Sequence, residues 1–376
     1  MPDAPPALCR RDGRIGWITL NRPRALNALN LPMMRAATAA LREWEDDPAV
    51  AVILIDGAGE RGFCAGGDIR DVRGSALGDP EHASVLWREE YELDALIADY
   101  PRPVAVIMDG ITMGGGVGLG AHASVRIVTE RTVMAMPEVQ IGLAPDVGSA
   151  FRLSRAPGET GTHCALTGAR LGAQDAVYCG LADQAVMSDR LSSVTEVLAD
   201  PQVPADPAAL LSRIWQVAGN DDGAPGDLAA GRTWIDECYQ AATVEEILAA
   251  LRARPETQAK AAAAAIEAAA PTALKVTLRA LRAARSMTHV RECLAQDYRL
   301  CMRFMQSHDL VEGIRAAVID KDRTPHWEPA TLPEVTEPMV DRYFASLGDR
   351  ELWPPRQFTN VLALVFHGSL VAGRRA

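Results

Sequence analysis

The stretch Gly110-Ile-Thr-Met-Gly-Gly-Gly-Val-Gly-Leu-Gly120 decides how this chain folds. It follows a short apolar run, residues 104–108, that predicts a buried strand. Because glycine has no Cβ, the backbone N–H groups of such a run can approach a ligand directly. If a helix begins there, these amides also lie at its positive end and favour negative charge. Taken alone, the glycines favour a phosphate-binding turn or a tight strand–helix junction.

A second strand and glycine loop lie about fifty residues upstream. Residues 50–55 predict another buried strand, and Gly62-Phe-Cys-Ala-Gly-Gly-Asp68 follows it closely. Asp68 is a candidate N-cap for the next segment. Neither loop matches a dinucleotide-binding fingerprint, and the chain has no phosphate-binding loop of the type G-x-x-x-x-G-K-[ST]. We expect the two loops to contribute one amide each to a single oxyanion hole.

Two acids lie downstream, in Met136-Pro-Glu138 and in Pro145-Asp-Val-Gly148. A carboxylate beside a polarised carbonyl group can act as a general base or as a nucleophile. From the residues alone, a first-turn helix charge and an N-cap explain Glu138 and Asp146 more simply. If a loop folds Asp146 back toward Glu138, the two carboxylates raise each other's pKa, which suits base catalysis near neutral pH.

These motifs together resemble the crotonase (enoyl-CoA hydratase/isomerase) superfamily, and more closely its 3-hydroxyisobutyryl-CoA hydrolase branch. The resemblance to the branch also rests on Arg88-Glu-Glu-Tyr91 and on a late segment, residues 312–323, and it spans about residues 10 to 345. It implies an α/β, crotonase-like fold of stacked ββα units with a mostly helical C-terminal region. The organisation that we predict is a catalytic core over residues 1–200, a helical region over 201–345 and a tail of unknown role over 346–376.

The resemblance also implies a role for each matching residue. Gly67 and Gly115 would donate backbone N–H groups to the thioester oxygen, and Glu138 would be the catalytic carboxylate. Asp146 would bind the hydroxyl end of the substrate or help to place the attacking group. The positions implied as substrate-binding are Gly66, Asp68, Glu90 and Gly114.

Gly118 departs from the pattern of the hydratases, which carry a second catalytic glutamate two residues after the Gly-Gly-Gly run. Addition of water to a double bond uses two carboxylates, so the hydratase reaction is not expected. We predict hydrolysis of a short-chain 3-hydroxyacyl-CoA thioester, namely 3-hydroxyisobutyryl-CoA in valine breakdown. A Δ3,Δ2-enoyl-CoA isomerase and an inactive acyl-CoA-binding protein stay open as alternatives. Whether Glu138 acts as a nucleophile or as a general base stays open too.

The composition agrees with a globular metabolic enzyme. Of the 376 residues 48% are hydrophobic, and the net charge of −11 argues against binding to nucleic acids or anionic membranes. The seven cysteines show no C-x-x-C pair or zinc spacing, which favours reduced thiols and no metal. The N-terminus lacks a signal or presequence pattern, which predicts a cytoplasmic protein. No cofactor is expected beyond the coenzyme A of the substrate, and self-association into a homo-oligomer is left open.

Several residues that invite a chemical role are better explained by packing or by surface charge. Cys64 is expected to be a small buried side chain, and His122 and His163 are expected to be packed or surface histidines. Four basic residues could contact the phosphates of coenzyme A, although surface charge explains each of them better. They are Arg22, Arg24, Arg61 and Lys275. The patterns predict strands over 15–20, 50–55, 104–108, 125–129 and 132–135, and helices over 31–44, 83–98, 161–167, 173–178, 244–254 and 259–269.

Overall fold

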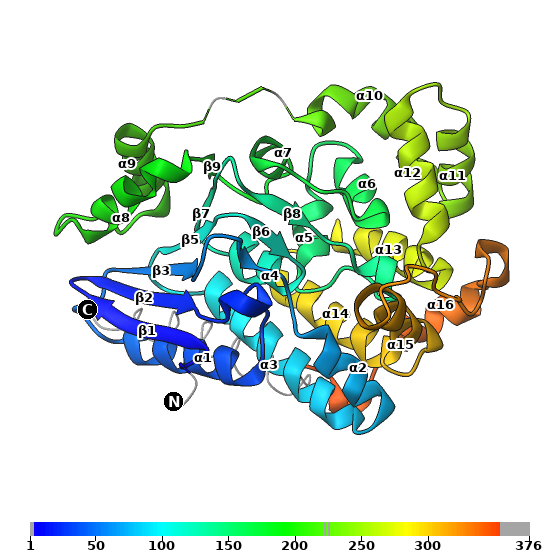
Figure 1. Cartoon of the computed structure of the whole chain (residues 1–376), viewed down its shortest axis with the longest axis horizontal. Coiled ribbons are helices and arrows are strands. Elements are labelled where there is room, and N and C mark those ends of the chain that lie inside the picture. Colours follow the sequence, from blue (N-terminus) through cyan, green and yellow to red (C-terminus); the bar gives the residue numbers. More distant parts are fainter. Residues whose placement is uncertain (1–3, 222, 225, 354–376) are drawn as a thin grey trace, which may run out of the picture.

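The computed structural model describes residues 4–221, 223–224 and 226–353 (Figure 1). At its centre is a six-stranded sheet in the order β1-β2-β3-β5-β7-β9. Every neighbouring pair in this sheet is parallel except β1 and β2, as the alternation of strands and helices predicts. The strands are β1 (Ala7–Asp12), β2 (Ile15–Leu20), β3 (Val52–Gly57), β5 (Val104–Met108), β7 (Val125–Val128) and β9 (Gln184–Ala185).

A smaller parallel sheet has the order β4-β6-β8. Its strands are β4 (Gly62–Cys64), β6 (Ile111–Met113) and β8 (Val133–Ala135). Each follows directly on a strand of the large sheet, so that β3–β4, β5–β6 and β7–β8 each give one strand to each sheet. The chain therefore repeats one small unit three times, which is the stacked arrangement expected from the sequence.

Helices α1 (Leu31–Glu45) and α3 (Pro80–Ala98) pack beside each other, and α1 also packs on β1 and β2. The side chain of Asn30 accepts a hydrogen bond from the Met33 N–H, and proline follows in the first turn, so the start of α1 is set locally. Asp79 caps α3 in the same way, through the Glu81 N–H. Both helices were expected, and the capping residues explain why α3 begins three residues earlier than its apolar pattern.

The chain after β9 is mainly helical, as predicted, and its described part contains no further strand. One apolar core includes Ala7 and Leu352, so the helices after residue 226 pack into the same interior as the first sheet strands. The helical residues 191–218 instead pack in a second apolar cluster with Ile15 and Val52. The division at residue 200 stays a prediction. The remaining α-helices are α2 (Ile69–Leu77), α4 (Gly115–Ala121), α5 (Ser149–Leu153), α6 (Thr160–Thr167), α7 (Ala173–Tyr178), α8 (Leu191–Ala199), α9 (Pro207–Ala218), α10 (Asp227–Tyr239), α11 (Val244–Arg252), α12 (Thr257–Ala268), α13 (Pro271–Ala284), α14 (Val290–Phe304), α15 (His308–Ile314) and α16 (Glu337–Phe344).

The predicted tail begins against the folded body. Arg299 of α14 forms an ion pair with Glu351 at 2.9 Å, and Leu352 is buried. The apolar run 361–366 lies outside the described residues. Within the described chain no single helix is long and apolar enough to cross a membrane; α12 and α13 pass only as a pair bent by 114°, on length and composition alone.

Candidate active site

Three segments predicted to carry the chemistry lie at one edge of the small sheet. The loop with Gly66 and Gly67 follows β4, Gly114 and Gly115 follow β6, and Glu138 follows β8. Because these three strands are parallel neighbours, their carboxyl ends meet at the same edge. The fold thereby brings together motifs that are far apart in the sequence.

The two glycine loops contact each other. Gly66 has φ +99°, and a Cβ built on it would lie 3.4 Å from the Gly115 nitrogen and 3.1 Å from the Met113 oxygen. Helix α4 begins at Gly115, where a backbone N–H has no partner within the helix. Within the described part of the chain, neither the Gly67 nor the Gly115 N–H donates to another residue. Both amides are thus available, as an oxyanion hole requires.

All eight predicted site residues line one cleft of about 1150 Å³. Gly66, Gly67 and Asp68 lie on one wall, and Gly114 and Gly115 lie beside them. The three acids that complete the set are Glu90, Glu138 and Asp146. Their roles stay predictions, but their meeting in one cleft is what those roles require.

Glu138 is the first residue of the short 3-10 helix η2 (Glu138–Ile141), and its side chain is 6% exposed. Its Oε1 lies 3.0 Å from the point that a Cβ on Gly114 would take, whereas Oε2 has no hydrogen-bond partner among the described residues. Burial raises the pKa of Glu138 well above its ordinary value, and the carboxyl group of Asp146 raises it further. One carboxylate oxygen is therefore free to accept a proton or to attack.

Asp146 lies in the loop between η2 and α5, and this loop does fold back into the cleft. The Tyr91 hydroxyl of α3 donates to its Oδ2 at 2.6 Å, and the Cys301 thiol of α14 lies 3.6 Å from the same oxygen. Burial raises the pKa of Asp146 to about 6, although the hydrogen bond from Tyr91 opposes the rise. Because the pKa of Asp146 is about 6 and that of Glu138 lies well above its ordinary value, the first negative charge of the pair resides mainly on Asp146.

Glu90 extends from α3 into the space between the two glycine loops. Its Oε2 lies 3.9 Å from the point that a Cβ on Gly67 would take, and its Oε1 fills the space that a Cβ on Gly115 would need. Burial raises its pKa to about 8, and repulsion from Asp146 adds to this effect. Glu90 therefore stays a neutral carboxylic acid at neutral pH, beside the place where an oxyanion would form.

Asp68 takes the N-cap position of α2, but its side chain does not cap the helix, so that part of the prediction is wrong. Its carboxylate instead pairs with Arg22 at 3.1 Å, and an ion pair across the cleft wall competes with the local cap. Among the expected phosphate contacts, Arg22 alone lines the cleft. The other arginines of the described cleft wall are Arg70, Arg170 and Arg323.

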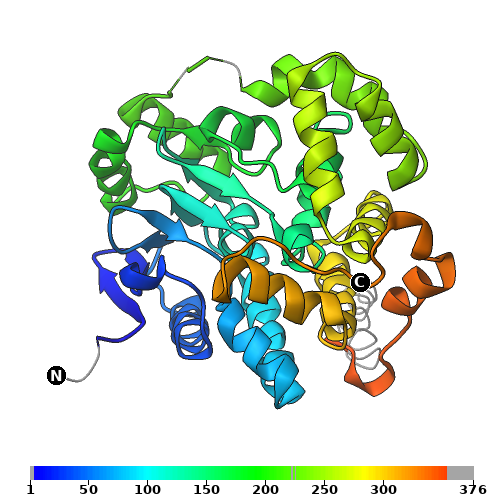
Figure 2. The ribbon, with the colours of Figure 1, turned by 45° about the vertical axis from the view of Figure 1, so that its right-hand side comes forward.

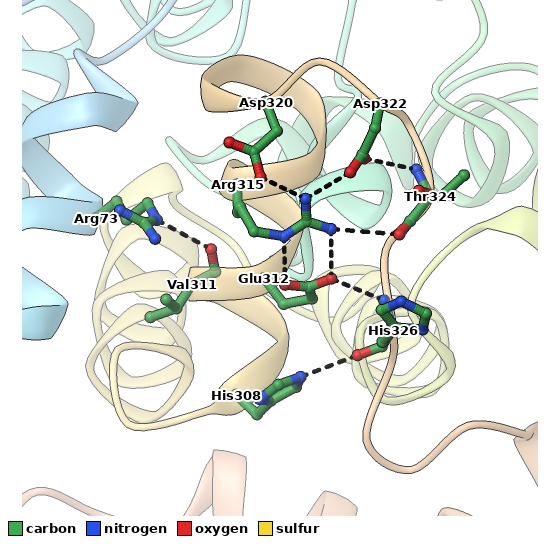
Figure 3. Close-up of polar contacts among 9 residues, drawn as sticks. All are labelled: Arg73, His308, Val311, Glu312, Arg315, Asp320, Asp322, Thr324 and His326. Atoms are coloured by element: carbon green, nitrogen blue, oxygen red, sulfur yellow. Dashed lines mark hydrogen bonds and ion pairs between the residues drawn. The ribbon is translucent and has the colours of Figure 1, made fainter.

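A C-terminal segment, residues 308–326, lines one side of the cleft, and we call it the cleft strap. Its ribbon lies beside α2 (Figure 2). It consists of α15, a π-helical turn η4 (Arg315–Ile319) and a loop. Figure 3 shows the Arg315 guanidinium among three carboxylates: it donates to both oxygens of Glu312 at 2.8 Å and to Asp320 and Asp322 at 2.7 and 2.6 Å. These contacts hold the pKa of Glu312 at about 2 and fix the loop that carries Arg323 into the cleft.

The residues around Asp146 were missed by the sequence interpretation, which gave no role to Tyr91 or Cys301. Tyr91 stands in a motif that signalled the family, but nothing in the motif says where its hydroxyl points. Cys301 is separated from Asp146 by 155 positions and carries no local signal. Cys64, His122 and His163 are buried, as expected of packed side chains.

Comparison with known proteins finds relatives that match this chain over more than nine tenths of its length. The chain is 40% identical over 347 residues to a mitochondrial 3-hydroxyisobutyryl-CoA hydrolase of Danio rerio (92% of this chain, 91% of the relative). It is 42% identical to the rat protein of the same name, with 92% and 90% covered. Among solved structures, a carnitinyl-CoA dehydratase of Mycobacterium thermoresistibile has a TM-score of 0.86 and 44% identity, covering 93% of this chain and 98% of that chain. An enoyl-CoA hydratase of Rhodobacter sphaeroides has a TM-score of 0.85 and 40% identity, with 93% and 99% covered.

These relatives contradict the predicted cytoplasmic location, because the hydrolases carry the word mitochondrial in their names. The prediction was wrong because it rested on the first few residues. A targeting segment is separate from the fold that it directs, so these residues are a poor guide to location.

The family assignment rests on the whole domain rather than on single motifs. The family model described as enoyl-CoA hydratase/isomerase matches residues 15–344, which include every strand from β2 to β9 and the cleft strap. The crotonase-like fold expected from the sequence is confirmed by the two solved structures of high similarity. The chain belongs to the enoyl-CoA hydratase/isomerase family.

Proposed function

We propose that this chain hydrolyses 3-hydroxyisobutyryl-CoA to 3-hydroxyisobutyrate and coenzyme A. The observation that carries the proposal is the arrangement of the cleft, in which Glu138 and Asp146 line the same space as two unpaired glycine amides. The relatives named as 3-hydroxyisobutyryl-CoA hydrolases, at 40–42% identity over about nine tenths of both chains, support the same reaction.

The amides of Gly67 and Gly115 would bind the thioester oxygen and stabilise the negative charge that develops when the carbonyl carbon is attacked. Loss of one such donor typically costs about 2.7–4 kcal/mol of transition-state stabilisation. Glu138 then acts by one of two balanced routes. As a general base it takes a proton from water, whose oxygen attacks the carbonyl carbon, and the proton leaves with the coenzyme A thiolate. As a nucleophile it expels the thiolate itself, and water later opens the mixed anhydride.

Asp146 would bind the 3-hydroxyl group of the substrate. Its pKa of about 6 leaves it negatively charged at neutral pH, so it accepts a hydrogen bond from that hydroxyl while Tyr91 donates to its other side. A substrate without this hydroxyl would leave the buried carboxylate short of one hydrogen bond, which is costly. We therefore expect selectivity for 3-hydroxyacyl groups.

The chemistry uses only side chains and backbone of this chain, with coenzyme A as part of the substrate. The phosphates of coenzyme A would meet the basic side of the cleft, where Arg170 and Arg323 are exposed. Neither of these two side chains forms an ion pair with a described residue.

Hydration of an enoyl-CoA is the second candidate, because two similar structures are described as a dehydratase and a hydratase. Gly118 speaks against it. A side chain at this position would meet Val147 and Asp94 within 3.1 Å, and Gly118 itself does not line the cleft. The remaining acid near the thioester, Glu90, lies against Gly115 of the predicted oxyanion hole.

The test is a thiol-release assay over a panel of acyl-CoA thioesters, run beside an assay for loss of the conjugated double bond. Release with 3-hydroxyisobutyryl-CoA that is lost in Glu138→Gln supports the proposal. Glu89→Gln is the matched control, because Glu89 is paired with Arg35 on the surface. Hydration or double-bond migration without thiol release would instead support a hydratase or an isomerase. Silence in both assays would leave an acyl-CoA-binding protein.

A further inference from the structure

The loop that carries Asp146 is held in an unusual backbone conformation. Val147, the next residue, has φ +53°, and Gly148 has φ +72°. Glycine adopts this left-handed region readily, but for a β-branched residue it is an outlier. Such strain persists only where the surrounding structure enforces it, and it is concentrated at functional sites.

Two buried side chains enforce this turn from opposite sides. The Nε2 atom of His122 lies 2.8 Å from the Val147 carbonyl oxygen, and Asp297 Oδ2 accepts the Gly148 N–H at 2.8 Å. Because a carbonyl oxygen only accepts, the hydrogen must be on His122 Nε2. Burial lowers the pKa of His122 to about 3, so the ring is neutral and keeps this single role. Asp297 is completely buried within α14.

A glycine completes the support. A Cβ on Gly118 would lie 2.7 Å from the Val147 Cβ and 2.8 Å from Asp94 Oδ2, closer than real atoms approach. The missing side chain at position 118 therefore provides the socket into which Val147 fits. His122 also follows the last residue of α4, and Gly115 is the first residue of the same helix. Helix α4 thus connects Gly115, whose amide would bind the oxyanion, to His122, which holds the turn after Asp146.

We propose that His122 and Asp297 are positioning residues, which clamp the Val147–Gly148 turn in the socket of Gly118 and so aim Asp146 into the cleft. Neither touches the substrate. Without the clamp, Val147 would relax toward its preferred negative φ, and the carboxylate one residue earlier would turn away from Glu138. A misplacement of about 1 Å in the site, even when caused by a change far from the reacting atoms, can cost on the order of 100-fold in rate.

The experiment compares His122→Leu and Asp297→Leu with the conservative variants His122→Gln and Asp297→Asn. We expect the leucine variants to lose about 100-fold in kcat with a much smaller change in KM. The conservative variants should recover most of the loss, because an amide can still donate to Val147 or accept from Gly148. Gln296→Leu is the matched control, since Gln296 is a buried neighbour on α14 that bonds to Ala280 instead of the turn. A leucine variant with unchanged kcat would overturn the proposal.

A double-mutant cycle separates positioning from general stability. If the clamp acts through Asp146, Asp297→Leu should reduce kcat by less than about threefold in the Asp146→Asn variant, because the effects of substitutions at coupled residues do not add. Full additivity would mean a structural role and would reject the inference.

If the leucine variants do not fold, the cycle is run with Gly118→Ala, whose methyl group presses on Val147. The inference rests on the proposed hydrolase activity, but the two fail differently: an inactive wild-type chain refutes the function, whereas additivity in an active one refutes the clamp.

Discussion

The carboxyl group of Glu90 lies against the backbone of Gly115, in the space that any side chain at position 115 would need. It also lies near Gly67, so an acid is close to both glycines whose amides would hold the thioester oxygen. This arrangement is compatible with an oxyanion only while Glu90 is neutral. Its pKa of about 8 keeps it neutral at physiological pH, and burial is the main cause.

Ionisation of Glu90 should therefore set the alkaline limb of the pH profile. Above about pH 8 the carboxylate opposes the developing oxyanion, so kcat/KM should fall by about tenfold per pH unit. Glu90→Gln is neutral at every pH and should remove this limb, at whatever absolute rate it retains. The measurement is kcat/KM from pH 6 to pH 10. An unchanged limb in Glu90→Gln would assign it to another group.

The acid limb should belong to the pair formed by Glu138 and Asp146. A charged Asp146 raises the pKa of Glu138, so removal of that charge lowers the pKa at which Glu138 becomes active. Asp146→Asn should therefore shift the acid limb of kcat/KM to lower pH, although the maximal rate falls. Glu138→Asp provides the comparison, because it keeps the repulsion. A shift to higher pH in Asp146→Asn would contradict the assigned coupling.

The glycine loops and both acids of this pair could be singled out from the sequence because each lies in a motif that carries the family resemblance, and their roles stay predictions. The environment of Asp146 was not. Its contacts join residues that are 55 positions apart for Tyr91 and 155 for Cys301, and the clamp joins Gly148 to a residue 149 positions later. No local pattern encodes such pairs. The positive φ of Val147 is even opposed by its local preference, so only the tertiary structure can impose it.

The short strands were missed for a related reason. Strands β4 and β6 have three residues each and lie within the glycine-rich segments, where local composition predicts loops. They become strands only because the repeated unit places them side by side. Strand β1 was missed because it is an edge strand with five exposed residues, so it shows no apolar run.

Asp94 should destabilise the fold increasingly as the pH rises. It is completely buried, and neither of its oxygens has a hydrogen-bond partner among the described residues. Burial raises its pKa far above the unfolded value, so the folded chain binds one more proton and loses stability above about pH 4. At pH 4 the free energy of unfolding of Asp94→Asn should not exceed that of wild type. At pH 8 it should be higher than that of wild type by at least ~1 kcal/mol. Denaturant unfolding at both pH values measures this, with exposed Asp71→Asn as the control.

Arg315 should affect substrate binding more than chemistry, because it lies in the cleft strap and not beside the thioester. It fixes a loop in which Lys321 and Arg323 have φ of +60° and +56°. We expect Arg315→Met to raise KM for the acyl-CoA about tenfold, or about 1.4 kcal/mol, and to change kcat less than threefold. Arg254→Met is the control, because Arg254 also pairs with more than one carboxylate, those of Glu237 and Glu256, but lies outside the cleft strap. An equal rise in KM in both variants would show that the strap has no special role.

Restoring the glutamate of the hydratases should not restore hydration. In Gly118→Glu the new side chain would start within 2.8 Å of both Val147 and Asp94, so it must displace the turn that carries Asp146. We expect this variant to lose thiol release by at least about 100-fold and to gain little hydration of crotonyl-CoA. The two assays are run on the same preparation, after its thermal unfolding shows a folded protein. Robust hydration would mean that the socket tolerates a side chain, and that close packing against Val147 is not what requires glycine at position 118.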